Sequence, residues 1–261
     1  MSASAGPQTS HTLGWPRLHL RRTDSTNERA RELAIAGAPA GTLVTAGEQS
    51  AGRGRQGRRW SAPAGSSILM SLVLRDLPPL LPLIAAVAVC DVAGDQAMIK
   101  WPNDVVVMGA GSVPAKLAGI LVEGRPQHGW AVLGIGLNVA VRLEDLPPEL
   151  RPGAPSAPDG TQPRPAASMG REPDELEPVL SALLRALADR LGEAPSETLN
   201  AWRERDALKG RRISWNGGHG TADGIDGNGR LVVALDAGGQ TELRAGEVHL
   251  ERIGAGPRPS D

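Results

Sequence analysis

The sequence predicts an α+β protein in which a mixed, largely antiparallel sheet is flanked by helices, with a small β-barrel at the carboxyl end. Hairpin turns separate apolar runs of strand length between residues 99 and 139, which predicts an antiparallel meander. Apolar residues recur at helical spacing in residues 175–191, which predicts an amphipathic helix outside that sheet. Short β runs separated by glycine turns fill residues 207–254, a pattern typical of a small barrel.

The length of 261 residues is enough for one large domain or two smaller ones, each with a sizeable core. The change of character near residue 207 favours two domains. We expect a disordered tail over 1–12, a main domain over 13–206, the barrel over 207–254 and a second disordered tail over 255–261.

The composition argues against nucleic-acid or membrane binding and favours a location in the cytoplasm. A formal net charge of −1 gives no global attraction to nucleic acid or membranes, so any anion binding must be local. Residues 1–10 lack the basic-then-apolar pattern of a signal peptide, and the apolar run 77–89 is too short to span a bilayer. The single cysteine, Cys90, lies in an apolar run, which indicates a buried thiol and a cytoplasmic protein.

The first elements surround a polar turn. We expect a strand over residues 15–22 and a helix over 29–36, with the polar segment between them. Ser25 and Glu28 have the spacing of a capping box, so capping is the simpler role for Ser25. The alternative is that this helix start holds a polar ligand with its free hydroxyls and amides. Strands over 42–46 and 67–74 and a buried helix over 82–94 follow.

Residues 51–60 read AGRGRQGRRW and join two apolar strands through a loop with three glycines and four arginines. Glycine lets a ligand approach the main chain closely, and the arginine side chain matches the geometry of carboxylates and phosphates. The alternative is a solvated or nucleic-acid-binding RG segment. A disordered segment of that kind would not lie between two core strands, so we expect a loop that becomes ordered around an anion.

A polar turn, Pro102-Asn103-Asp104, interrupts the apolar run over residues 99–108. Polar groups in such a run need partners or a ligand. The return strand over 115–123 carries Lys116, one of only three lysines in the chain. A lysine on a core strand either extends to water or faces a ligand, and we favour the ligand. A third strand over 130–139 completes the meander.

The second half begins with a proline-rich connection over 141–173, which holds a short apolar island at 166–169. The helix over 175–191 has apolar residues at 176, 179, 180, 183, 184, 187 and 191, and a further short helix is expected over 196–205. The β runs of the barrel are expected at 211–215, 220–225, 231–235, 241–243 and 248–253.

The motifs together resemble the biotin protein ligases, and the matching segments run from about residue 17 to 253. The matching segments are DSTN at 24–27, EQSAGRGRQGRRW at 48–60, KWPND at 100–104, KLAGILVE at 116–123 and GIGLNV at 134–139. The glycine–arginine loop and KWPND, in this order, are the most specific of them. Residues 207–253 look like the SH3-like carboxyl-terminal domain of that family. The resemblance is to the monofunctional type without a DNA-binding domain, so no DNA partner is expected.

The resemblance implies a two-step reaction. Biotin and ATP, with Mg²⁺, give biotinyl-5′-AMP, and the biotinyl group then passes to one lysine of a biotin carboxyl carrier protein domain. It implies biotin contacts from Ser25, Thr26, Asn27, Gln49, Gly52, Arg53, Gly54, Arg55, Lys116 and Gly119. It implies ATP contacts from Arg55, Arg58, Trp60, Asn103, Asp104, Lys116 and Asn138. Catalytic roles fall to Lys116, Arg55 and Asp104, and Mg²⁺ is expected to bind mainly through the substrate phosphates.

The implied chemistry suits these residue types. When a carboxylate attacks the α-phosphate of ATP, two anions meet, and the arginines of the loop together with Lys116 can offset their repulsion. The acceptor lysine must lose a proton, although the pKa of a free lysine is about 10.4. Asp104 is a candidate to orient or deprotonate that lysine.

Two departures and two rival functions remain at this point. Trp60 is followed by Ser-Ala-Pro where the family has Phe-Ser-Pro, and the chain contains no Phe and no Tyr, so the contacts that cover adenine stay open. A lipoate ligase or octanoyltransferase on the same fold is the nearest rival. A nucleic-acid-binding protein with an RG loop is the other, and the near-zero net charge argues against it. No membrane partner is expected, and a homodimer is left open.

Overall fold

A computed structural model of the chain describes residues 13–75, 77–108, 113–125, 128–154, 165–244 and 246–250. The two predicted tails, 1–12 and 255–261, lie outside these ranges. None of the helices in the described part of the chain is both long and apolar enough to cross a bilayer.

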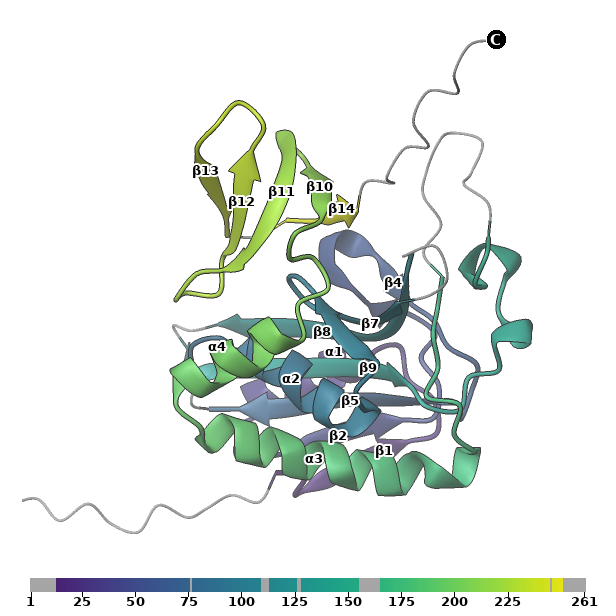
Figure 1. The fold of residues 1–261 in the computed structure, drawn as a ribbon. Coiled ribbons are helices and arrows are strands. Elements are labelled where there is room, and N and C mark those ends of the chain that lie inside the picture. The colour runs from purple at the N-terminus through teal and green to yellow at the C-terminus, as the bar shows by residue number, and fades with distance from the viewer. Residues whose placement is uncertain are drawn as a thin grey trace, which may run out of the picture.

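The apolar runs of the first half assemble into one seven-stranded sheet with the strand order β1-β2-β5-β9-β8-β7-β6 (Figure 1). The strands are β1 (Arg17–Leu20), β2 (Leu43–Ala46), β5 (Ser67–Leu74), β6 (Ala97–Lys100), β7 (Asp104–Met108), β8 (Pro114–Arg125) and β9 (Trp130–Asn138). The β1–β2 pair is parallel and the other neighbours are antiparallel. The prediction of an α+β protein with a mixed sheet is therefore confirmed.

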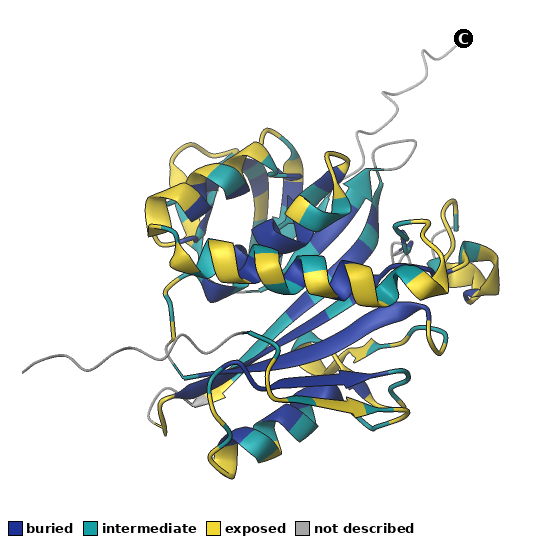
Figure 2. Ribbon diagram, turned by 90° about the horizontal axis from the view of Figure 1, so that it is seen from below, coloured by how far each residue is buried: buried dark blue, intermediate teal, exposed yellow. Residues whose placement is uncertain are grey.

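Helices cover both faces of this sheet. Helix α1 (Thr26–Ile35) lies on one face, and the other face carries α2 (Leu81–Ala93), α3 (Leu176–Gly192) and α4 (Pro195–Glu204) (Figure 1). Figure 2 shows the buried strands between the two helical layers. Every residue of β5 is buried as a result, which explains why its sequence is a nearly continuous apolar run and not an alternating one.

The helices form where their apolar spacing predicted. In α3 the buried residues are Val179, Leu180, Leu183 and Leu187, which lie on the predicted apolar stripe. Helix α2 buries Cys90 completely, and this burial raises the pKa of the thiol to about 12. The prediction of a buried thiol is confirmed.

The predicted capping box at the start of α1 is wrong. Ser25 occupies the N-cap position, but within the described chain its side chain makes no capping hydrogen bond. Its backbone N–H instead donates to Oδ1 of the preceding residue, Asp24, at 2.7 Å. The Glu28 carboxylate turns away from the helix start and pairs with Arg31 and Arg53. The hydroxyl of Ser25 is thereby left to the cavity described below.

The carboxyl-terminal strands form a separate five-stranded sheet with the order β13-β12-β11-β10-β14. They are β10 (Arg212–Trp215), β11 (Gly218–Ile225), β12 (Leu231–Leu235), β13 (Gln240–Leu243) and β14 (Val248–Leu250). In the described residues this sheet is open, with β13 and β14 at its two edges, so a closed barrel is not confirmed. The predicted run to residue 253 extends past the described part of β14.

The hydrophobic core is continuous between the two sheets. One cluster of buried side chains includes Leu133 of β9, Val87 of α2 and Leu231 of β12. Two hydrogen bonds reinforce the contact, because Trp101 Nε1 donates to Gly229 O at 3.0 Å and Lys100 Nζ donates to Val248 O at 2.8 Å. The five-stranded sheet is thus attached to the KWPND turn.

Candidate active site

A cavity of about 700 Å³ opens where the two sheets meet. Its walls come from the start of α1, the glycine–arginine loop, the KWPND turn, the middle of β8 and β9, and residues 246–250 of the carboxyl-terminal sheet. The following predicted site residues line it: Ser25, Thr26, Asn27, Gln49, Arg53, Gly54, Arg55, Arg58, Trp60, Asn103, Asp104, Lys116, Gly119 and Asn138. Gly52 lines a second hollow under the same loop. The fold therefore brings the predicted residues together, and their individual roles stay predictions.

The parallel pairing of β1 and β2 places the DSTN segment beside Gln49. The pairing continues past the strand ends, where Thr23 N donates to Glu48 O at 3.0 Å and Ser50 N donates to Thr23 O at 2.9 Å. Gln49 Oε1 then accepts the backbone N–H of Thr26 at 2.7 Å and its hydroxyl at 3.1 Å. Hydroxyl and amide groups thus meet at one end of the cavity, where they can donate and accept hydrogen bonds.

The glycine–arginine loop contains a short hairpin of β3 (Gly52–Arg53) and β4 (Arg59–Trp60), which the sequence analysis missed. Gly52 is required at the base of the hairpin, since a Cβ there would lie 2.5 Å from Trp60 O. At the tip, Gln56 and Gly57 have φ values of 55° and 73°, in the left-handed region that favours glycine. The hairpin presents its arginines to the cavity.

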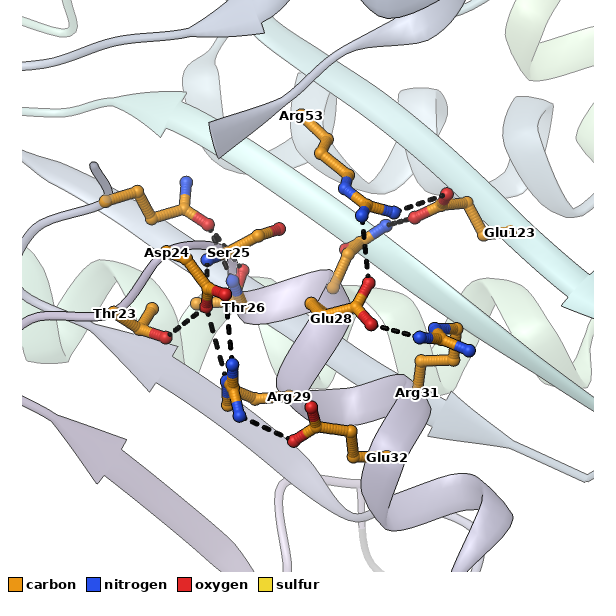
Figure 3. Close-up of polar contacts among 12 residues, drawn as sticks. Thr23, Asp24, Ser25, Thr26, Glu28, Arg29, Arg31, Glu32, Arg53 and Glu123 are labelled. Atoms are coloured by element: carbon orange, nitrogen blue, oxygen red, sulfur yellow. Dashed lines mark hydrogen bonds and ion pairs between the residues drawn. The ribbon is translucent and has the colours of Figure 1, made fainter. Parts of the chain in front are cut away.

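Arg53 is held at the base of the loop by two carboxylates. Its Nη2 lies 3.0 Å from Glu28 Oε2, and its Nη1 lies 3.6 Å from Glu123 Oε1 (Figure 3). Glu28 also pairs with Arg31, and this hydrogen bond lowers the pKa of the Glu28 carboxyl. Neither glutamate is among the predicted site residues.

Trp60 covers the glycines of β8 and β9. A Cβ at Gly136 would lie 2.5 Å from the indole ring, and one at Gly119 would lie 3.0 Å from it. Lys116 Nζ lies 5.5 Å from the centre of the ring, within range of a cation–π contact. Because these glycines have no side chains, the surface of β8 and β9 is flat there, and the indole rests on it.

Lys116 lines the cavity and pairs with an acidic side chain there, and its contact with a ligand stays a prediction. Its Nζ lies 2.7 Å from Asp104 Oδ1. The register between β7 and β8 shifts between Val105 and Val106, so that Val105 lies opposite Ala118 and Val106 opposite Lys116. An irregularity of this kind redirects side chains beside a site, and here it accompanies the ion pair.

Asn103 and Asn138 both use their amides to fix surrounding structure. Asn103 Oδ1 accepts from Arg55 Nη1 at 3.1 Å, and its Nδ2 donates to Ile120 O at 2.8 Å. Asn138 Nδ2 donates to Ala167 O at 2.9 Å, and its Oδ1 accepts from Ser67 Oγ at 3.2 Å. Arg55 is thereby tied to the KWPND turn across the cavity.

The donor set near Lys116 does not resemble a protein metal centre. Among the described residues there is no group of three or more His, Cys, Asp or Glu side chains that could hold a metal ion. Asp104 is the carboxylate on the KWPND turn, and it is paired with Lys116. A divalent cation at this site would need oxygens from a ligand such as a polyphosphate.

Comparison with known proteins places this geometry in a family. Residues 19–139 match the biotin/lipoate A/B protein ligase family. The biotin--[acetyl-CoA-carboxylase] ligase of Paracoccus denitrificans is 36% identical over 88% of this chain and 98% of its own length. The chain belongs to the biotin--[acetyl-CoA-carboxylase] ligase family. The ligase of Mycobacterium tuberculosis, also 36% identical, is covered over 90% of its length.

Two further matches to this biotin ligase are more limited, one in the length that is covered and one in sequence identity. Over 139 residues, which are 49% of this chain and 41% of the other protein's length, the chain is 45% identical to a bifunctional ligase/repressor BirA from Bacillus spizizenii. Its fold matches the biotin protein ligase of Aquifex aeolicus solved with biotin and ATP, with a TM-score of 0.71 over 90% of this chain and 98% of that one. Sequence identity there is 24%, so this likeness shows the fold alone.

Besides Glu28, the polar residues at the site that the sequence analysis did not identify include Ser71, Glu123 and Glu247. Ser71 is a polar residue at the centre of the apolar strand β5, which was a detectable signal. Glu123 ends the quoted KLAGILVE segment, but no local pattern gives its partners. Glu247 of the carboxyl-terminal sheet pairs with Arg58 of the loop, a contact that depends on how the two sheets pack.

Proposed function

We propose that the protein activates biotin with ATP to biotinyl-5′-AMP and pyrophosphate, and then transfers the biotinyl group to a lysine of a biotin carboxyl carrier domain. The observation that carries the proposal is the order of groups along β9 inside one cavity. Asn27 lies against Gly134, Trp60 lies over Gly136, and Asn138 follows. A hydrogen-bonding region at Asn27, a flat apolar region at Trp60 and a second amide at Asn138 thus follow one another along a single strand.

The three regions suit the three parts of the adenylate. The ureido head would bond to the hydroxyls and amide of Ser25, Thr26 and Gln49. The valeryl chain would lie beside the Trp60 indole, which rests on the glycines of β8 and β9. Arg55, Arg58 and Lys116 would stabilise the charge that develops when the biotin carboxylate attacks the α-phosphate of ATP, with pyrophosphate as the leaving group. Mg²⁺ would arrive with the phosphates.

The loop and the carboxyl-terminal sheet would enclose the adenylate. Arg58 reaches Glu247 and Arg55 reaches Asn103, so the loop contacts both walls of the cavity. Closure of this kind protects a mixed anhydride from water. In this proposal residues 13–206 form the catalytic domain, and residues 207–254 correspond to the SH3-like module of the family.

The proposal is tested by incubating the protein with biotin, ATP, Mg²⁺ and a purified carrier domain, and measuring the mass of the carrier. We expect one biotinyl group per carrier and no addition to a carrier whose acceptor lysine is replaced by arginine. Equal labelling of the two carriers would contradict specific transfer. Labelling with lipoate or octanoate in place of biotin would favour the sister activity.

A further inference from the structure

We infer that Glu123 is a positioning residue for the biotin head, because it sets the direction of the hydrogen bonds beneath that end of the cavity. The inference rests on the proposed function, since biotin is the ligand concerned. Glu123 lies on β8, and none of the roles proposed above includes it.

The chain of bonds begins at the Glu123 carboxylate. Asn27 Nδ2 donates to Glu123 Oε2 at 2.8 Å. A carboxylate can only accept, so it fixes which side of the Asn27 amide faces β8. The Asn27 carbonyl oxygen is then turned toward Ser71, whose hydroxyl donates to it at 2.6 Å. Both Asn27 and Ser71 are buried, at 5% and 0% exposure, so water cannot substitute for either bond.

The single proton of Ser71 decides what its neighbour offers. Because that proton is used on Asn27, Ser71 Oγ faces Thr26 Oγ1, 2.8 Å away, as an acceptor. Thr26 Oγ1 also lies 3.1 Å from Gln49 Oε1, which can only accept. The single Thr26 proton is therefore used inside this network, on Ser71 or on Gln49, and is not offered to the cavity. Without Glu123 the Asn27 amide could reverse, and the whole sequence of donors with it.

Two further contacts fix this chain of bonds. The Asn27 amide packs directly against the backbone of Gly134, since a Cβ at residue 134 would lie 2.1 Å from Asn27 Oδ1. The second oxygen of Glu123 faces Arg53 Nη1 at 3.6 Å, so the same carboxylate contacts the glycine–arginine loop (Figure 3). Glu123 thus links the loop to the polar end of the cavity.

The test measures ATP–pyrophosphate exchange with biotin for the parent and a set of variants. Glu123→Gln can turn either end of its amide toward Asn27, so we expect the KM for biotin to rise about tenfold, while the KM for ATP changes less than about threefold. The double variant Asn27→Asp with Glu123→Gln reverses the donor and the acceptor but keeps an oxygen toward Ser71. It should return the KM for biotin to within about threefold of the parent. Asn27→Asp alone places two carboxylates together and should be at least as impaired as Glu123→Gln.

Glu32→Gln is the matched control, because it removes the same charge from an exposed position of α1, and among the described contacts the Glu32 side chain bonds only to Arg29. Its KM for biotin should stay within about twofold of the parent. Should Glu123→Gln not fold, Ser71→Ala breaks the same chain one bond further on and should raise the KM for biotin alone. A parent-like KM in Glu123→Gln or Ser71→Ala, or a double variant no better than Glu123→Gln, would overturn the inference. A parent without biotin exchange would instead overturn the proposed function.

Discussion

The ion pair between Lys116 and Asp104 brings together the two groups on which the proposed chemistry most depends. Lys116 Nζ lies 2.7 Å from Asp104 Oδ1, and both side chains line the cavity. Lys116 would stabilise charge on the reacting carboxylate and phosphate in the first step. Asp104 would orient the acceptor amine or take its proton in the second step, since it stands on the turn that faces the cavity.

We expect Asp104→Asn to slow transfer from preformed biotinyl-5′-AMP to the carrier by about 10²-fold or more, because general-base catalysis typically contributes that much. The measurement is single-turnover transfer with purified adenylate, followed by mass spectrometry of the carrier. The exposed control Glu144→Gln should transfer at the parent rate. Undiminished transfer in Asp104→Asn would exclude Asp104 as orienting group and as base.

At the scale of single residues, the sequence indicated which side chains share the site but not all of their partners. Ser25 and Glu28 have capping-box spacing, yet Glu28 pairs with Arg53, which lies far along the chain. A local pattern contains no information about such long-range partners. Ser71 does carry a local signal, as a polar residue in an apolar strand, but no local pattern gives its partner Asn27 on another element.

The glycine floor is a property of the strands and not of any one residue. Gly134 lies against Asn27 and Gly136 against Trp60, two positions apart on the same face of β9. A strand with side chains at both positions would close the cavity from below.

Gly136→Ala should displace the Trp60 indole, because the new Cβ would lie 2.5 Å from it. We expect exchange activity with biotin to fall by roughly 10- to 100-fold, the range that corresponds to overpacking of a well-packed contact. Gly192→Ala adds a methyl group where no atom other than the neighbouring backbone of its own helix lies within 4 Å, and it should retain parent activity. Equal activity in the two variants would show that the contact between Trp60 and β9 is dispensable.

At the scale of elements, most strands and helices could be predicted from periodicity. Strands β5 and β12 occupy residues 67–74 and 231–235, as their apolar runs predicted. The β3–β4 hairpin could not, since it depends on left-handed backbone at Gln56 and Gly57 and on close contact at Gly52. Arginine-rich sequence alone contains no strand signal.

At the scale of the whole molecule, hydrogen bonds and packing attach the carboxyl-terminal sheet to the KWPND turn. Trp101, 2% exposed, is the main link, because its Nε1 donates to Gly229 O across the boundary between the sheets. Trp101→Phe should lower the free energy of unfolding by about 2–4 kcal/mol, since it leaves a cavity and an unpaired carbonyl. Urea denaturation measures this change. Trp15→Phe, at a side chain that is 74% exposed, should change stability by about 0.5 kcal/mol at most. Similar values for the two variants would contradict the link.

The partly buried Asp206 carboxyl, near the same boundary between the sheets, makes the stability of the protein depend on pH. Burial raises the pKa of this carboxyl, although Asp206 Oδ1 accepts the backbone N–H of Leu208 at 2.8 Å. Because the folded-state pKa lies above the unfolded value, the stability that Asp206 contributes is present below the unfolded pKa. It is lost as pH rises through the folded pKa. The stability of Asp206→Asn relative to the parent should therefore increase from pH 4 to pH 7 in urea denaturation. A difference that is constant with pH would contradict this account.

The arrangement of the two sheets was the part least predictable from sequence. The glycine turns in the sequence were enough to predict the five carboxyl-terminal strands. Whether their sheet closes into a barrel depends on which edge strands pair, and the turns do not indicate that. The structure describes an open sheet whose residues Val248 and Leu250 line the cavity. The contact of Glu247 with Arg58 follows from that packing, and no spacing in the sequence indicates it.

The most direct test of the central claim is ATP–pyrophosphate exchange with biotin, lipoate or octanoate as the acid, in the parent and in Lys116→Ala. We expect exchange with biotin alone in the parent, and loss of that exchange when Lys116 no longer faces Asp104 across the cavity. Exchange with lipoate or octanoate but not biotin would contradict the proposed substrate. Exchange with biotin that persists unchanged in Lys116→Ala would contradict the site.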